Sequence, residues 1–310
     1  MSTKEQTAGR PRVLILGSTG RIGSRVIAEL ERINTVSVVY SSRKPAQVEA
    51  WQRDGKDGVL LDLDQPETFP GAIFGIDRIF LSTGYTVAMV RQSKTIVDAA
   101  ADAGVKFIVH LGIFGNGRVT YAYGAWHEMV ERYIEGSGVA WTHLHPQFFM
   151  DNVLAAAPVV DGKFYWFTGN QPVGWIAPED IAAVVAKVLS DGPEPHGGKH
   201  YWLFTEMLNG RQAALEISKG LGLLVESVVL TPDDLAASVT SGAIKLPSFV
   251  EPTYGASILE WMRQTYDGRL SFAGVTTSIE ELTGEKPRTL EEWVRENREA
   301  VLSAASQQSA

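Results

Sequence analysis

Seven residues near the amino terminus have the spacing of a loop that holds the phosphates of a dinucleotide. They read Gly17-Ser18-Thr19-Gly20-Arg21-Ile22-Gly23 and lie between an apolar run at 13–16 and a helical pattern at 24–31. In such a loop the first glycine permits a tight turn, the second lets the backbone approach a pyrophosphate, and the third lets the helix pack on the strand. The helix amino terminus adds N–H donors. The pattern predicts nucleotide binding, with a structural turn as the alternative.

The residues after the second apolar run, at 36–40, distinguish the two nicotinamide dinucleotides. An Asp or Glu there holds the ribose 2′-hydroxyl of NAD, whereas an Arg accommodates the 2′-phosphate of NADP. Here the chain reads Tyr40-Ser41-Ser42-Arg43-Lys44, without an acid. Two cations and two hydroxyls suit a phosphate. We therefore expect NADPH as the cofactor, held by Ser42, Arg43 and Lys44. Arg21 could reach the same phosphate, and a solvated polar turn is the alternative.

Strand and helix patterns alternate through the first half of the chain. Apolar runs predict strands at 13–16, 36–40, 58–61, 78–81, 105–111 and 139–144, with helices at 24–31, 47–53, 87–103 and 125–135. Continuous apolar runs are typical of strands buried on both faces, and successive βαβ units form a parallel sheet. The expected fold class is therefore α/β, with a doubly wound parallel sheet of the Rossmann type.

The second half predicts a smaller α/β region that binds the substrate. Strands are expected at 201–204 and 225–230, and helices at 212–219 and at 181–189, the latter capped by Glu179 and Asp180. Thr289 with Glu292 predicts a capping-box helix start, and residues 303–310 predict a frayed polar tail. We assign 1–147 to the cofactor domain and 148–310 mainly to the substrate-binding region, with some elements returning to the first sheet.

Aromatic residues are concentrated in and around this second region. A flat apolar pocket could be lined by Phe114, Trp126, Phe148, Phe149, Trp166, Trp175 and Tyr254. Pockets for aromatic ligands have such linings. Core packing is the alternative and explains most of these residues.

Several segments together resemble the NmrA-like branch of the atypical short-chain dehydrogenase/reductases. They are the glycine loop, Arg43 followed by Pro45, Asp62-Leu63, residues 141–152 and residues 282–294, so the resemblance covers nearly the whole chain. That branch includes NAD(P)H-dependent quinone and dye reductases and also redox sensors without turnover. The resemblance therefore implies the fold more firmly than the activity.

The resemblance also implies further cofactor contacts. They are Asp62 and Leu63 at the adenine, Ser82, Thr83 and Gly84 beneath the cofactor, Leu111, Gly112 and Ile113 by the nicotinamide ribose, and His127, Pro146 and Phe148. The alternative interpretation is that these are small or polar residues at strand ends.

Tyr123 and His127 are the expected catalytic residues. The wider superfamily uses a Ser and a Tyr-x-x-x-Lys motif, in which Tyr donates a proton and Lys lowers its pKa. This chain has His127 in place of the Lys, and Gly112 takes the Ser position. Tyr123 and His127 share a helix face, and a His can bind a ribose or donate a proton near neutral pH. Tyr121 is a rival for Tyr123, and a helix-surface role is the alternative for His127.

The other histidines predict no metal site. His110, His143, His145, His196 and His200 lack metal-ligand spacing on one helix, and no carboxylate stands beside His143 and His145 in the sequence. Packing or hydrogen bonds to loop backbone are their expected roles. The chain has no cysteine, which excludes disulfides, thiolate catalysis and Cys-ligated clusters.

The composition limits the classes of molecule that the chain is expected to bind. The chain has 310 residues, a net charge of −8 and a pI near 5.3, without a block of basic residues. We therefore expect a small-molecule substrate and neither a nucleic acid nor a membrane as partner. The polar first residues contain no secretory signal, so a cytoplasmic location is expected. A homo-oligomer is compatible with the sequence.

These observations lead to three functional hypotheses. The first is an NADPH-dependent reductase of a flat aromatic, quinone or conjugated carbonyl substrate. Such an acceptor needs little acid assistance, which fits the missing Ser and Lys. The second is an NADP(H)-sensing regulatory protein without turnover. The third is a non-redox or coupling enzyme that tailors aromatic natural products.

Overall fold

Seven parallel strands form the central sheet of the protein, in the order β11-β6-β5-β4-β1-β2-β3. The computed structural model describes residues 9–115, 119–155, 159–242, 250–270, 276 and 278–308. The strands are β1 (Arg12–Ile15), β2 (Ser37–Ser42), β3 (Asp57–Leu60), β4 (Arg78–Leu81), β5 (Phe107–Leu111), β6 (Ala140–Pro146) and β11 (Lys199–Leu203). The predicted doubly wound sheet is confirmed. Its order reverses between β1 and β4, where such folds bind ligands.

Burial on both faces explains why β1 is apolar throughout. Val13 and Ile15 belong to the core on one side of the sheet, and Leu14 and Leu16 to the core on the other. Side chains alternate along a strand, so a strand between two helix layers needs apolar residues at every position. For the same reason, continuous apolar runs in the sequence predict these strands.

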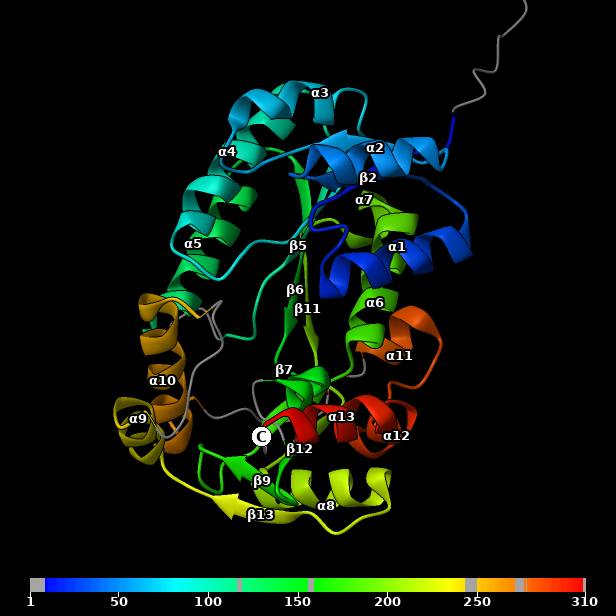
Figure 1. Ribbon diagram of the computed structural model, residues 1–310. Helices are drawn as coiled ribbons and strands as arrows, with labels where there is room; N and C mark the ends of the chain where they lie inside the picture. The colour runs from blue at the N-terminus through cyan, green and yellow to red at the C-terminus, as the bar shows by residue number, and fades with distance from the viewer. Residues whose placement is uncertain are drawn as a thin grey trace, which may run out of the picture.

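Helices cover the sheet on both faces (Figure 1). One layer contains α1 (Arg21–Ile33), α2 (Pro45–Arg53), α6 (Pro178–Asp191), α7 (Pro193–His196) and α11 (Ser278–Thr283), and the other contains α3 (Phe69–Ile73) with the preceding turn η1 (Pro66–Thr68), α4 (Ala88–Asp102) and α5 (Ala122–Glu135). No described helix is long and apolar enough to cross a bilayer.

The remaining elements form a smaller region below the carboxyl ends of the strands in Figure 1. Two three-stranded sheets have the orders β12-β10-β7 and β13-β9-β8. Their strands are β7 (Phe148–Phe149), β8 (Val159–Val160), β9 (Lys163–Trp166), β10 (Val173–Ile176), β12 (Glu206–Leu208) and β13 (Glu226–Val229). The helices here are η2 (Met150–Leu154), α8 (Gly210–Leu221), α9 (Pro232–Thr240), α10 (Pro252–Tyr266), α12 (Leu290–Glu296) and α13 (Arg298–Gln308). The division at residue 147 stays a prediction.

The prediction that Glu179 and Asp180 cap a helix is wrong. The helix α6 begins at Pro178 after Ala177, so both acids lie in its first turn. Asp180 accepts hydrogen bonds from the backbone N and the guanidinium of Arg288, and Glu179 accepts from Trp293. These acids therefore tie α6 to the carboxyl-terminal segment.

The carboxyl terminus is helical where a frayed tail was expected. The helix α13 extends to Gln308, because Val301 is 1% exposed and packs into the core of the second region with Leu302 and Ala305. Residues 309–310 lie outside the described residues. The capping box is confirmed: Thr289 accepts from the backbone of Glu292, whose side chain accepts from the backbone of Thr289.

Candidate functional site

The glycine loop lies at the carboxyl end of β1, beside the point where the strand order reverses. Gly17 has φ +70°, and Gly20 N donates to Gly17 O over 2.7 Å. A Cβ on Gly23 would stand 2.1 Å from Gly17 O, so no other residue fits there without moving backbone. The helix α1 begins at Arg21, earlier than the expected residue 24, and the loop therefore supplies its first turn. This cradle fits a dinucleotide pyrophosphate.

Ser18 supports the loop from within. Its hydroxyl is buried, donates to Ile15 O over 2.8 Å and accepts from Ser41 N over 2.9 Å. Ser41 donates to the same carbonyl. These bonds fasten the loop to β1 and β2, so the Ser18 side chain orients the loop. Thr19 is exposed, whereas Ile22 is buried against α6 and the sheet.

Arg43 and Lys44 are exposed at the carboxyl end of β2, where a 2′-phosphate would be recognised. Ser42 is half-buried, and its hydroxyl accepts from Lys44 N. Hydrogen bonds from Gln92 and Arg91, with the charge of Arg43, hold the pKa of Asp64 below its ordinary value. Arg43 and Arg91 therefore both lie close to the carboxylate of Asp64. Asp62 and Leu63 are half-buried just after β3.

The ends of β4 and β5 present the next expected cofactor residues. Ser82, Thr83 and Gly84 follow β4, and Leu111, Gly112 and Ile113 end or follow β5. Of these, Gly84 is exposed and Gly112 is buried. A Cβ on Gly112 would stand 2.8 Å from Glu131 Oε1. The carboxyl group of Glu131 therefore fills the space that a Ser side chain would need.

Pro146, Phe148 and Arg21 lie where the sheet meets the second region. Pro146 ends β6 and is buried, and the Phe148 ring packs edge-on against Trp175 with centroids 4.7 Å apart. Arg21 pairs with buried Asp151 over 2.9 Å and lies over the Phe149 ring. Arg21 is thus directed towards the second region. Burial raises the pKa of Asp151 in spite of Arg21.

Tyr123 and His127 lie together on α5. Their ring centroids are 4.8 Å apart, and Tyr123 also contacts Tyr254 of α10 at 5.0 Å and Tyr85 at 6.1 Å. Burial raises the pKa of Tyr123 well above its ordinary value, so its hydroxyl stays protonated. Tyr121, the rival, is 3% exposed and packs with Val119 and Leu270. Tyr123 is therefore the better candidate.

His127 is a neutral imidazole in this environment. Burial and the charge of His145 lower its pKa to about 3, and neither ring nitrogen has a hydrogen-bond partner among the described residues. Its ring lies between Tyr123 and His110. A proton-donating imidazolium at neutral pH is therefore disfavoured, and a surface role is excluded by its burial.

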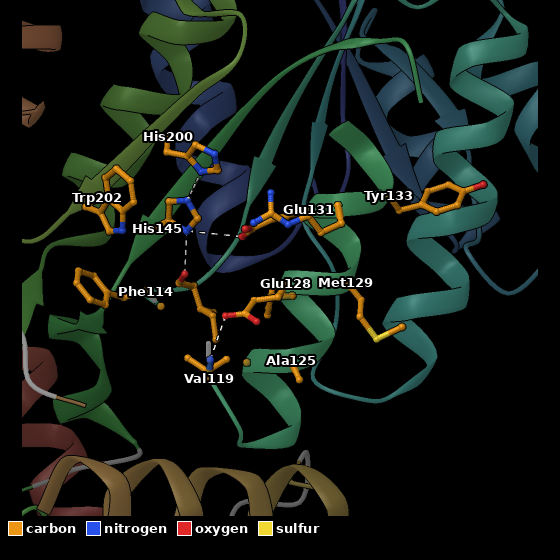
Figure 2. Close-up of a pocket in the computed structure, with 15 residues that line it drawn as sticks. Phe114, Val119, Ala125, Glu128, Met129, Glu131, Tyr133, His145, His200 and Trp202 are labelled. Atoms are coloured by element: carbon orange, nitrogen blue, oxygen red, sulfur yellow. Dashed lines mark hydrogen bonds and ion pairs between the residues drawn. The ribbon is translucent and has the colours of Figure 1, made fainter. Parts of the chain in front are cut away.

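A pocket of about 800 Å³ opens between α5, β6 and β11 (Figure 2). Glu131 of α5, His145 of β6 and His200 of β11 converge on it, with Phe114 and Trp202 at its rim. Burial and the charges of Glu135 and Glu128 raise the pKa of Glu131 to about 8. Sequence reasoning missed Glu131, although it follows His127 by one helical step of four residues.

The aromatic residues divide between core and pocket. Trp166 and Trp175 are buried and stacked on each other in the core of the second region, so they do not line a pocket. Phe114 lines the pocket of Figure 2, and Tyr254 contacts Tyr123. Core packing is thus the role of the two tryptophans.

A doubly wound sheet whose first strand leads through a glycine loop into a helix defines a Rossmann-type dinucleotide-binding protein. The NmrA-like family model matches residues 10–294, and the chain belongs to this family. The expected family and fold class are confirmed.

The relatives include oxidoreductases. An NAD(P)H azoreductase of Xenophilus azovorans is 28% identical over 299 residues, 94% of this chain and 100% of that protein. Quinone oxidoreductase 2 of Escherichia coli (strain K12) is 27% identical over 240 residues, 74% of this chain and 81% of that protein. A crystal structure of an NADPH-dependent quinone oxidoreductase from Escherichia coli, complexed with NADPH, has a TM-score of 0.78 at 26% identity, covering 92% of this chain and 99% of that chain. These relatives support the expectation of an oxidoreductase.

Proposed function

We propose that the protein is an NADPH-dependent reductase of a flat aromatic acceptor such as a quinone or a conjugated carbonyl compound. The observation that carries this proposal is the glycine loop at the end of β1, together with the exposed pair Arg43 and Lys44 at the end of β2. The similarity to an azoreductase and a quinone oxidoreductase supports the reaction class. When bound, NADPH supplies a hydride.

The chain's own residues bind and orient the two reactants in this proposal. The amino terminus of α1 would hold the pyrophosphate, and Arg43 and Lys44 the 2′-phosphate. Tyr123, protonated at neutral pH, offers a hydroxyl donor to the substrate oxygen. Neutral His127 offers one N–H to a ribose or an amide. A conjugated acceptor suits this set, because it accepts a hydride with little acid assistance.

The test is NADPH oxidation with purified protein against quinones, enones, azo dyes and triarylmethane dyes. We expect turnover with at least one class, faster with NADPH than with NADH. The variant Gly20→Val should abolish turnover, because its Cβ would stand 3.0 Å from Gly17 O and its branches would enter the pyrophosphate space. Tight NADPH binding without turnover on any acceptor would contradict the proposal.

A second function is favoured by the departures at the catalytic positions. Gly112 has no hydroxyl, and the ring nitrogens of His127 are enclosed. A sensor that binds NADP(H) and signals to a protein partner needs neither group. The same assay separates the two functions, since a sensor would bind NADPH and show no turnover with the whole panel.

A further inference from the structure

Two histidine rings meet edge to edge at the wall of the pocket in Figure 2. His145 Nε2 lies 2.9 Å from His200 Nδ1, the ring planes differ by 15°, and the ring centroids are 5.2 Å apart. Trp202 stacks on His145 with centroids 5.2 Å apart, and Trp141 contacts His200 at 5.1 Å. The two facing nitrogens are therefore held towards each other by packing from both sides.

The outer nitrogen of each ring faces an oxygen. His145 Nδ1 lies 2.9 Å from Ile113 O, which can only accept, so this nitrogen carries the proton. His200 Nε2 lies 4.0 Å from Glu135 Oε1, a buried atom with no hydrogen-bond partner among the described residues. His143 Nε2 lies 3.8 Å from the same oxygen, so either histidine can direct a proton towards that carboxylate. With its proton on Nε2, His200 presents a lone pair to that of His145 Nε2, and a cation between the two nitrogens would stabilise this arrangement; with its proton on Nδ1, His200 donates to His145 Nε2.

A carboxylate completes the donor set. One ligand atom each from Glu131, His145 and His200 lies within 4.8 Å of the others. Glu131 is flanked on its helix by Glu128 and Glu135, and the only basic side chain near it on α5, Arg132, is exposed and paired with Glu135. Two imidazoles and one carboxylate, with water in a fourth position, are a common zinc donor set.

We propose that Glu131, His145 and His200 bind one divalent transition-metal ion, such as Zn²⁺, with a fourth position open to the pocket. Zinc–nitrogen bonds of about 2.0–2.1 Å require the facing nitrogens to separate from 2.9 Å to roughly 3.3 Å. His200 can make this adjustment because its side chain is 31% exposed on the edge strand β11. Ile113 O and Glu135 then act as the outer hydrogen-bond partners that orient metal-binding histidines.

The experiment uses the full chain without an affinity tag, treated with chelator and then titrated with Co²⁺ by visible absorption and with Zn²⁺ by calorimetry. We expect one ion per chain. His200→Asn and Glu131→Gln should each weaken binding by at least about 100-fold, because losing an outer partner alone costs about 10–100-fold. Glu135→Gln should give that smaller loss. The matched control is His196→Asn, since His196 lies outside the proposed site and bonds Asp191 and Tyr201.

Three results would overturn the proposal: no saturable binding of either ion at one per chain, undiminished binding in both ligand variants, or an equal loss in His196→Asn. Circular dichroism and NADPH titration of every variant show that it is folded. NADPH affinity and metal affinity are measured separately in each variant, because Ile113, whose carbonyl faces His145, is also an expected nicotinamide contact. The metal site and the reductase proposal therefore fail independently. If His200→Asn does not fold, Glu131→Gln and Glu135→Gln carry the test.

Discussion

The glycine loop and the pocket of Figure 2 are built in opposite ways. The loop consists of consecutive residues, 17–23, and its binding groups are backbone N–H donors at a helix start. The pocket collects side chains from α5, β6 and β11, and its binding groups are imidazoles and carboxylates. The comparison teaches that the loop is defined by backbone packing, which is tightest at Gly23, whereas the pocket is defined by the chemistry of its side chains.

The largest expected effect is that of Gly23→Ala. The added Cβ would stand 2.1 Å from Gly17 O and 2.7 Å from Gly17 C, and this backbone cannot yield without opening the loop. We expect no measurable NADPH binding in fluorescence titrations and an unfolding free energy lower by about 1–3 kcal/mol. The control is Gly71→Ala, which has no atom within 4 Å of the new Cβ. Wild-type NADPH affinity in Gly23→Ala would show that the loop is not the site.

Arg43→Ala tests whether the loop region selects the cofactor by charge. Loss of a charge-assisted bond to the 2′-phosphate should weaken NADPH binding by roughly 10–100-fold and leave NADH binding unchanged. Arg53→Ala, at the other end of α2, is the control. Equal affinities of the wild type for NADPH and NADH would refute the predicted preference.

The buried histidines predict a loss of stability in acid. Burial lowers the pKa of His127 to about 3 and also lowers that of His110, so in the unfolded chain both bind protons more readily than in the folded one. Stability should therefore be fully present above the ordinary His pKa of about 6.5 and decrease below it, with a contribution from His127 of about 2 kcal/mol at pH 5. Urea unfolding at pH 7 and pH 5 measures this. His127→Leu should reduce the difference; an unchanged difference would mean that His127 is not buried as a neutral ring.

The smallest expected effect lies far from both sites. Thr289→Ala removes the side-chain bond to Glu292 N at the start of α12 and should cost about 1 kcal/mol of unfolding free energy. Ser303→Ala, at an exposed position of α13, is the control. NADPH binding should be unaffected. A change in NADPH affinity with Thr289→Ala would show that α12 and the loop are coupled.

The first half of the fold could be predicted because its signals are local. Its strands coincide with short apolar runs, and the glycine spacing marks the start of α1 within three residues. The strands β7, β8, β9, β10 and β12 were not predicted, because they are short and lie in irregular sequence interrupted by Gly and Pro. Residues 303–308 were misread because only contacts with the second region make them helical.

The candidate site could be predicted only where it consists of neighbouring residues. The loop and the pair Arg43 and Lys44 lie where the sequence placed them, but the role of Ser18 as an internal support depends on Ser41, which is distant in sequence. The pocket was missed for the same reason. Glu131 and His145 meet only because α5 packs on the face of β6.

We expect the ion pair between Arg21 and Asp151 to couple cofactor binding to proton uptake. If a phosphate draws the Arg21 guanidinium away, the Asp151 carboxylate is left buried and unpaired, and its pKa, already raised by burial, rises further. The chain would then take up a proton when it binds NADPH. Calorimetric titrations in two buffers with different ionisation enthalpies should give different apparent binding enthalpies near pH 5, and the difference should vanish in Asp151→Asn. Identical enthalpies in the wild type would mean that Arg21 keeps its partner and that the second region stays fastened to the loop whether or not the cofactor is present.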